Sequence, residues 1–303
     1  MKDLKEFITY LKKERGYSDY TIKNYELDII DFLEYCKENK LNIYKVKYFD
    51  VKSYLVKLHE KDYKGTTISR KISSLRTFYS FLYDNNLIDK NIFKYVVVPK
   101  KEKRLPKYIT NDDVKSIFDV PDICSPIGKR NRLILELLYG TGIRVSELCN
   151  IKVKDIDINE KTIRILGKGS KERIVFYGDV CAEILELYLS DGRNVLLNKK
   201  NNEYLIIGAY KKDKPLTTRS VELIINDIIE KAAINKKVTP HVLRHTFATH
   251  LLNEGCDILM VKELLGHSSL DTTGIYTDVS NERLRKVYLD THPRAKQWFI
   301  SNY

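Results

Sequence analysis

A short basic segment bounded by two prolines divides this chain of 303 residues into two parts. The segment reads Pro99-Lys-Lys-Glu-Lys-Arg-Leu-Pro106-Lys. Because proline disfavours helical backbone in the residue before it, a helix is not expected to continue through the segment. We therefore predict a helical domain over residues 1–98, an extended linker over 99–107 and a second domain over 108–303. The linker cations that could lie along a DNA backbone are Lys100, Lys101, Lys103 and Arg104.

Helical periodicity runs through the first predicted domain, where apolar side chains recur every three or four residues in four stretches. Ser18 is a candidate N-cap for the second of these helices. Four amphipathic helices with short connections predict a small all-α bundle. The polar side of the fourth helix carries three cations among small hydroxyl residues: Arg70, Lys71 and Arg76. This pattern suits contacts with phosphate, and it equally suits a solvated helix face.

Alternating apolar and polar residues appear in one region of the second predicted domain. Val153–Ile158, Thr162–Leu166 and Arg173–Phe176 alternate in this way and predict a three-stranded antiparallel meander. The rest of the domain has helical periodicity, as in the stretch from Arg130 to Tyr139. The predicted fold is therefore mainly α with a small antiparallel sheet, in two domains.

The charge balance limits the class of partner. Lys and Arg number 53 against 41 Asp and Glu, a net charge of +12, which favours nucleic acid or an anionic membrane surface. No apolar run approaches about 18 residues, so no transmembrane helix is predicted. The first residues also lack the apolar core of a signal peptide. The five scattered cysteines predict free thiols in the cytoplasm, and no residues have metal-ligand spacing, so neither metal nor other cofactor is expected.

Side chains suited to phosphate chemistry lie at predicted helix starts. Thr239 is a candidate N-cap and Pro240 suits the first helical position, so His241 and Arg244 lie one turn apart on the same helix. An imidazole beside a guanidinium at a helix N-terminus favours binding of an anion, most simply a phosphate. Arg144 has the same spacing to Glu147, which could hold its guanidinium or form an ordinary surface ion pair.

Three further residues complete an ordered set. Lys168 lies between two glycines at the predicted tip of a hairpin, His267 follows a predicted helix end at Gly266, and Tyr276 ends a short helix. Each of them alone has an ordinary structural explanation. The whole set is more specific: Arg144, Lys168, His241, Arg244, His267 and Tyr276.

This set, in its order and local contexts, resembles the tyrosine recombinases, and within them the short Xer-type members. The motifs that carry the resemblance are Gly142-Ile-Arg144-Val-Ser-Glu147-Leu, the hairpin Lys168, His241-x-x-Arg244, Leu265-Gly-His267-Ser-Ser-Leu, Ile275-Tyr276-Thr and His292-Pro-Arg-Ala295. One departure is Asp278, where Xer proteins usually place His. The resemblance covers almost the whole chain and implies a C-shaped two-domain clamp, with a helical core-binding domain and a catalytic domain.

The resemblance also implies a reaction. A tyrosine recombinase cuts and rejoins DNA through a covalent 3′-phosphotyrosine link, without metal or cofactor. Arg144 and Arg244 would hold the scissile phosphate, Tyr276 would attack it, and Lys168 would protonate the departing 5′ oxygen. The two imidazoles would act beside them: His241 on the proton of the tyrosine, and His267 as a donor to a phosphate oxygen.

The implied partner is a double-stranded DNA recombination site held by four protomers, either identical or shared with a second recombinase. The implied outcome is resolution of chromosome or plasmid dimers, or a related inversion or integration. The tail after Pro293, with apolar Trp298 and Phe299, is expected to dock on a neighbouring protomer. Two alternatives are a type IB topoisomerase-like enzyme, which has similar chemistry, and a DNA-binding protein without catalysis. Loss of one of the six residues would favour the latter, and all six are present.

Overall fold

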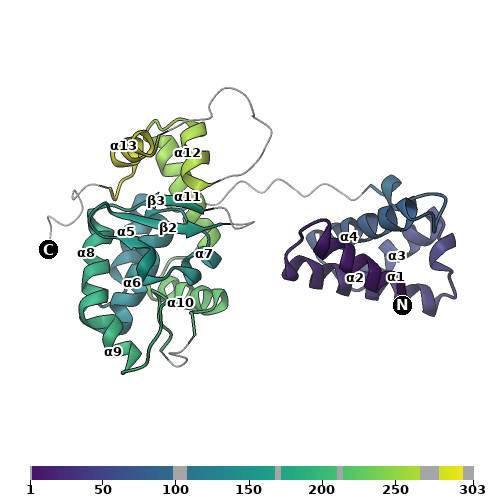
Figure 1. Cartoon of the computed structure of the whole chain (residues 1–303), viewed down its shortest axis with the longest axis horizontal. Coiled ribbons are helices and arrows are strands. Elements are labelled where there is room, and N and C mark those ends of the chain that lie inside the picture. Colours follow the sequence, from purple (N-terminus) through teal and green to yellow (C-terminus); the bar gives the residue numbers. More distant parts are fainter. Residues whose placement is uncertain (1, 98–107, 168–171, 210–213, 267–279, 296–303) are drawn as a thin grey trace. The chain divides into compact units, whose positions relative to one another are not determined.

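The computed structural model describes residues 2–97, 108–167, 172–209, 214–266 and 280–295. The chain divides into two compact units, residues 1–104 and 105–303 (Figure 1). The predicted linker, residues 99–107, lies wholly outside the described residues. Each unit is built around its own core, as expected for chain segments of about 100 and 200 residues.

The first unit is a helical bundle, as predicted. Its elements are α1 (Lys2–Lys13), α2 (Asp19–Glu38), the 3-10 turn η1 (Ile43–Lys45), α3 (Tyr48–Glu60), α4 (Gly65–Asp84) and η2 (Ile92–Tyr95). The hydroxyl of Ser18 accepts a hydrogen bond from the backbone N–H of Thr21, which confirms the N-cap of α2. Aromatic rings fill much of the core, with Phe32 packed edge-on against Tyr54 and Phe93.

Helix α6 (Pro126–Gly140) is the central element of the second unit, where it contacts α7, α8, α9 and α11 (Figure 1). Its residues from Leu133 to Tyr139 are all buried, because neighbouring elements cover it on every side. The other helices of this unit are α5 (Asn111–Asp119), α7 (Val145–Asn150), α8 (Asp179–Leu187), the π-turn η5 (Tyr188–Gly192), α9 (Arg193–Leu197), α10 (Thr218–Lys231), α11 (Pro240–Asn253), α12 (Ile258–Leu265) and α13 (Asn281–Thr291).

A three-stranded antiparallel sheet, in the order β1-β2-β3, completes the described part of this unit. Its strands are β1 (Ile156–Asp157), β2 (Thr162–Leu166) and β3 (Glu172–Phe176). Ile163 pairs with Val175 and both are buried, so the predicted alternation is confirmed for the last two strands. The first predicted strand is wrong over most of its length, since Val153–Asp155 forms the 3-10 turn η3. The cause is the Asp155 carboxylate, which accepts the Lys152 backbone N–H at 3.0 Å and curls the chain.

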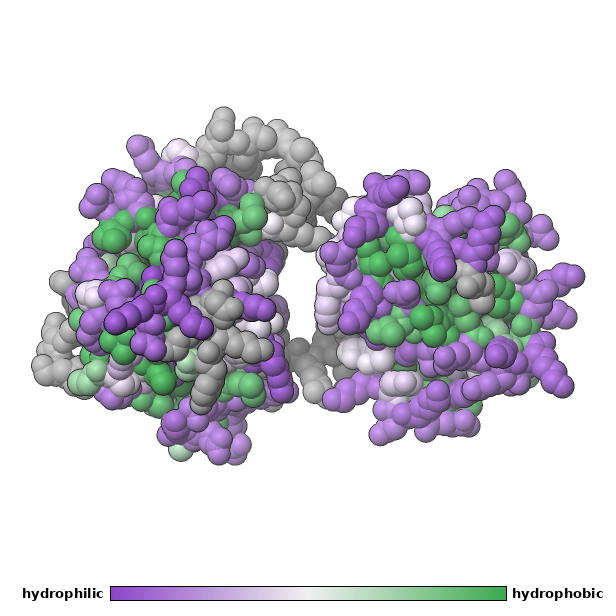
Figure 2. All heavy atoms as spheres, turned by 60° about the horizontal axis from the view of Figure 1, so that its bottom comes forward, coloured by the Kyte–Doolittle hydropathy of each residue, from purple (hydrophilic) through white to green (hydrophobic). Residues whose placement is uncertain are grey.

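The mainly helical fold class with a small sheet is therefore confirmed. Hydrophilic side chains cover most of the face shown in Figure 2, and apolar side chains show between them on both units. Among the described helices, none is long and apolar enough to span a membrane.

Candidate active site

Helix α11 begins as predicted and holds one candidate residue in the interior and one at the surface. The Thr239 hydroxyl accepts the Val242 backbone N–H at 3.3 Å, and Pro240 occupies the first helical turn. Arg244 is buried, whereas His241, one turn earlier, is exposed. The first turns of α11 therefore carry one side chain that solvent can reach, His241, and one that is buried, Arg244.

The guanidinium of Arg244 is held by two backbone carbonyls from other segments. Nη1 donates to the Gly142 carbonyl, and Nη2 donates to the Leu265 carbonyl at 2.8 Å. Gly142 lies between α6 and α7, and Leu265 ends α12. Arg244 therefore ties together three segments that are far apart in the chain.

Gly142 has to be glycine at this junction. Its φ is +62°, and a Cβ there would lie 2.5 Å from Cδ1 of Phe247 and 2.9 Å from Cδ2 of Leu265. Only a residue without a side chain combines this backbone conformation with such close packing. The glycine thus brings the chain leading to Arg144 directly onto α11.

Arg144 is fixed through Glu147, its neighbour one turn on. Both the Arg144 backbone N–H (2.8 Å) and Nη1 (2.9 Å) donate to this carboxylate, so Arg144 is the N-cap position of α7. The Glu147 carboxylate also accepts two bonds from Arg173 on β3. Burial alone would raise the pKa of Glu147, but the bonds from Arg173 and Arg144 outweigh it and lower the pKa. The pair predicted between Arg144 and Glu147 is therefore confirmed, and it is partly buried instead of a surface pair.

The site is strongly cationic. Burial, together with the positive charges of Arg144 and Arg173, lowers the pKa of Arg244 to about 10, with Glu147 acting in the opposite direction. Arg244 is still protonated at neutral pH. Three guanidinium groups and one carboxylate leave an excess of positive charge, so an anion is the ligand that this arrangement favours.

Of the six predicted residues, the structure brings Arg144 and Arg244 together, and it places His241 at an exposed position one turn before Arg244 on α11. The other three, Lys168, His267 and Tyr276, lie outside the described residues. Two of these are flanked by elements that reach the site. Lys168 falls between β2 and β3, and His267 directly follows Gly266, the left-handed C-cap of α12. The C-cap at Gly266 confirms the predicted helix end.

Arg173 was absent from the predicted set. The sequence contained a signal for it, because Arg173 and Val175 alternate onto the same face of β3 and Val175 is buried. A charged residue at an inward position of a strand requires a partner. That partner is Glu147, which the sequence places 26 residues earlier and which only the fold identifies.

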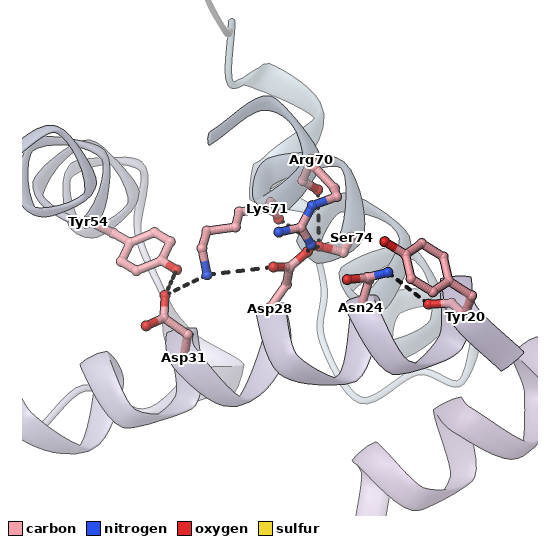
Figure 3. Close-up of polar contacts among 8 residues, drawn as sticks. All are labelled: Tyr20, Asn24, Asp28, Asp31, Tyr54, Arg70, Lys71 and Ser74. Carbon is pink, nitrogen blue, oxygen red and sulfur yellow. Dashed lines mark hydrogen bonds and ion pairs between the residues drawn. The ribbon is translucent and has the colours of Figure 1, made fainter. Parts of the chain in front are cut away.

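The cations predicted on the polar side of α4 do not form one exposed face. Lys71 is buried, and its ammonium lies 3.0 Å from Asp31 and 3.5 Å from Asp28 (Figure 3). Arg70, which is partly exposed, forms an ion pair with the buried Asp28. The expectation of an exposed Lys71 is wrong, since two carboxylates on α2 draw it into the contact between α2 and α4.

Arg76 also has an intramolecular role. Its Nε donates to the Phe93 carbonyl at 3.1 Å and its Nη2 to the Val96 carbonyl at 3.0 Å, which holds η2 against α4. The predicted linker contacts, Lys100, Lys101, Lys103 and Arg104, lie outside the described residues. In the part of the chain that the structure describes, no His, Cys, Asp and Glu side chains gather as a metal site.

Comparison with family models assigns both units. The model described as the phage integrase family matches residues 107–283, and the phage integrase N-terminal SAM-like domain matches residues 4–86. The first match covers more than half of the chain and includes all six predicted residues.

Curated relatives match over nearly their full length. The chain is 45% identical to tyrosine recombinase XerC of Anoxybacillus flavithermus, over 95% of this chain and 97% of the relative. It is 46% identical to tyrosine recombinase XerC of Staphylococcus epidermidis, over 96% and 97%. Among solved structures, XerH site-specific recombinase bound to its difH substrate before cleavage is similar, with 26% identity, a TM-score of 0.68 and coverage of 93% of this chain and 82% of that one.

Proposed function

We propose, on the premise that this chain belongs to the phage integrase family and is a Xer-like site-specific tyrosine recombinase, that Arg144 and Arg244 bind the scissile phosphate. The observation that carries this proposal is the junction at Gly142. There, Arg144 and Arg244 approach closely enough for the charge of one to lower the pKa of the other. Two permanently charged, forked donors suit the non-bridging oxygens of a phosphodiester.

The remaining roles follow from what the transfer of a phosphoryl group needs. The hydroxyl of Tyr276 attacks phosphorus as its proton leaves, the bond to the 5′ oxygen breaks, and a 3′-phosphotyrosine forms. Lys168 gives a proton to the departing 5′ oxygen. In the reverse direction, a 5′-hydroxyl from another duplex attacks the same link and releases the tyrosine.

The two imidazoles would assist the transfer. His241 is exposed one turn before Arg244, a position that supports a role in moving the tyrosine proton. His267 directly follows Gly266, whose neighbour Leu265 gives its carbonyl to Arg244. This connection supports a role for His267 as a donor to a phosphate oxygen.

The proposed substrate is a double-stranded DNA site bound by four protomers, identical or shared with a second recombinase. Similarity to XerH in complex with difH supports a DNA partner. The two units would close on the duplex as a clamp, and residues 1–98, 99–107 and 108–303 would act as core-binding domain, linker and catalytic domain. We further propose that the reaction takes place in the cytoplasm and resolves chromosome dimers or serves a related rearrangement, as the Xer-type resemblance of the sequence implies.

Trapping on a nicked duplex tests this chemistry. A nick close to the cleavage position lets the short 5′-hydroxyl strand diffuse away, so that the covalent intermediate accumulates. The proposal predicts a protein–DNA adduct that survives denaturation, together with joined products on paired sites. Relaxation of supercoils without joined products would favour topoisomerase-like activity, and binding without an adduct on a cognate site would contradict the proposed catalysis.

A further inference from the structure

Arg173 lies on β3, the second strand of the β2–β3 hairpin, and its side chain reaches Glu147 in the candidate active site. Its Nη1 lies 3.0 Å from Oε1 of Glu147 and its Nη2 lies 2.8 Å from Oε2, so the two groups meet as fork and carboxylate. Only 17% of the Arg173 side chain and 5% of the Glu147 side chain is exposed. The pair is therefore shielded from solvent, where hydrogen bonds between charged groups are strong.

Glu147, held by Arg173, in turn fixes the position of Arg144. Each oxygen of its carboxylate accepts one bond from Arg173 and one bond from Arg144. The Arg144 side chain is 42% exposed, and a pair of this kind between Arg144 and Glu147 alone would be weak. With Arg173 also bonded to both carboxylate oxygens, Glu147 keeps one orientation, and so does Arg144.

Arg173 also packs against Gly266, the C-cap of α12. A Cβ on Gly266 would lie 2.6 Å from Cδ and 2.7 Å from Nε of Arg173, so the glycine packs directly on this side chain. Gly266 has a φ of +63° and precedes His267. A single side chain thus contacts both the start of α7 and the end of α12.

The donors of Arg173 are directed into the protein. Both terminal nitrogens bind Glu147, and Nε is buried beneath Gly266. The charge of Arg173 is thus paired with a carboxylate through both terminal nitrogens, whereas those of Arg244 bind neutral carbonyls and Arg144 gives only one guanidinium nitrogen to Glu147.

We propose that Arg173 is a positioning residue, which orients Arg144 for the scissile phosphate by fixing Glu147. This inference rests on the proposed role of Arg144 as a phosphate ligand. It predicts that the effect of Arg173 on cleavage depends on an intact arginine at position 144.

The test is a double-mutant cycle with the full chain on a nicked duplex, measuring the first-order rate of adduct formation at saturating DNA. Arg173→Gln should slow this step by about tenfold to a hundredfold, the effect of losing hydrogen bonds to a charged group. In an Arg144→Lys background the same substitution should slow it by less than about threefold. The affinity for DNA should stay within about twofold of the parent in both backgrounds.

Two controls make the outcome specific. Arg164→Gln changes an exposed arginine on the neighbouring strand β2 and should leave the rate unchanged. Arg173→Lys keeps the charge and should recover part of the rate, which also covers the case in which Arg173→Gln fails to fold. If Arg144→Lys alone does not slow cleavage, the proposed phosphate site is wrong.

If Arg144→Lys does slow cleavage but Arg173→Gln has equal effects in both backgrounds, the positioning role is wrong and the phosphate site stands. A loss of DNA affinity, with the salt dependence of binding reduced by about one phosphate contact, would instead make Arg173 a direct phosphate ligand and overturn the proposal.

Discussion

Nη1 of Arg244 donates a hydrogen bond to the carbonyl oxygen of Gly142, which lies 102 positions earlier in the chain. Through this contact, the segment that carries Arg144 is attached to the helix that carries His241. Because the Gly142 backbone has a positive φ and its Cα packs on Phe247, the contact depends on the absence of a side chain at this position. The two segments of the site, one carrying Arg144 and the other His241 and Arg244, are therefore joined through the backbone at Gly142.

Replacing Gly142 tests this junction. Gly142→Ala should destabilise the second unit by about 2–4 kcal/mol, because it combines backbone strain with a clash against Phe247 and Leu265. Adduct formation should fall as well, since the carbonyl that holds Arg244 must move. The measurement is urea unfolding together with the nicked-duplex assay.

Gly140→Ala is the matched control, because a Cβ there meets nothing within 4 Å. It should leave stability unchanged or raise it by up to about 1 kcal/mol. Equal stability of both alanine variants would show that the junction tolerates a side chain, contrary to the structure.

The two-nitrogen geometry of the Arg244 guanidinium should contribute more to the rate of adduct formation than its charge does. Arg244→Lys keeps a cation, but one ammonium cannot reproduce two carbonyl contacts and a forked phosphate contact. We expect adduct formation to slow by about a hundredfold or more. Arg219→Lys, at an exposed position of α10, serves as control and should cleave like the parent. A wild-type rate for Arg244→Lys would remove Arg244 from the proposed phosphate site.

Lys71 is expected to contribute to stability and not to DNA binding. Lys71→Gln should destabilise the first unit by about 2–3 kcal/mol, because it removes a buried partner of Asp28 and Asp31. Lys23→Gln, at an exposed position of α2, should change stability by less than about 0.5 kcal/mol. The salt dependence of DNA binding should be the same for both variants. A slope reduced by about one for Lys71→Gln alone would identify Lys71 as a phosphate contact after all.

His292 gives the second unit a defined pH dependence. Complete burial, together with the charge of Arg294 and the nearby His250, lowers the pKa of His292 to about 3. Above the ordinary His pKa of about 6.5 both the folded and the unfolded forms are neutral. As pH falls below that value, only the unfolded form takes up the proton, so stability is lost between about pH 6.5 and about pH 3.

Proton uptake by His292 in the unfolded form should therefore lower the free energy of unfolding by about 2 kcal/mol between pH 7 and pH 5. Urea unfolding at each pH measures this change. Asn can accept the Arg294 backbone N–H that Nδ1 of His292 accepts at 3.2 Å. His292→Asn should thus flatten the pH dependence, whatever its effect at neutral pH. An unchanged slope for His292→Asn would contradict the assigned protonation state.

Local rules predicted the parts of the fold that depend on near neighbours. The N-caps at Ser18 and Thr239, the C-cap at Gly266 and the pairing of β2 with β3 all follow from residues a few positions apart. The first strand was mispredicted because an alternating pattern cannot show that Asp155 turns back onto the Lys152 N–H. Competition between side chain and backbone decided that case.

Contacts between residues far apart in the chain could not be predicted from the sequence. Lys71 was expected on an exposed face, since its partners Asp28 and Asp31 lie on another helix. The link from Arg173 to Glu147 likewise requires the strand to lie against α7. The family resemblance identified the chemistry, whereas only the fold shows which side chains hold the arginines in place.

The proposed reaction links the DNA covalently to one tyrosine, Tyr276. The chain has 21 tyrosines, so locating the linked residue is a stringent test. The adduct formed on a nicked duplex would be digested with protease and nuclease, and the peptide carrying the residual nucleotide identified by mass spectrometry. The expected result is a single modified peptide with the nucleotide on Tyr276, absent in Tyr276→Phe. A nucleotide on another residue, or an adduct that persists in Tyr276→Phe, would contradict it.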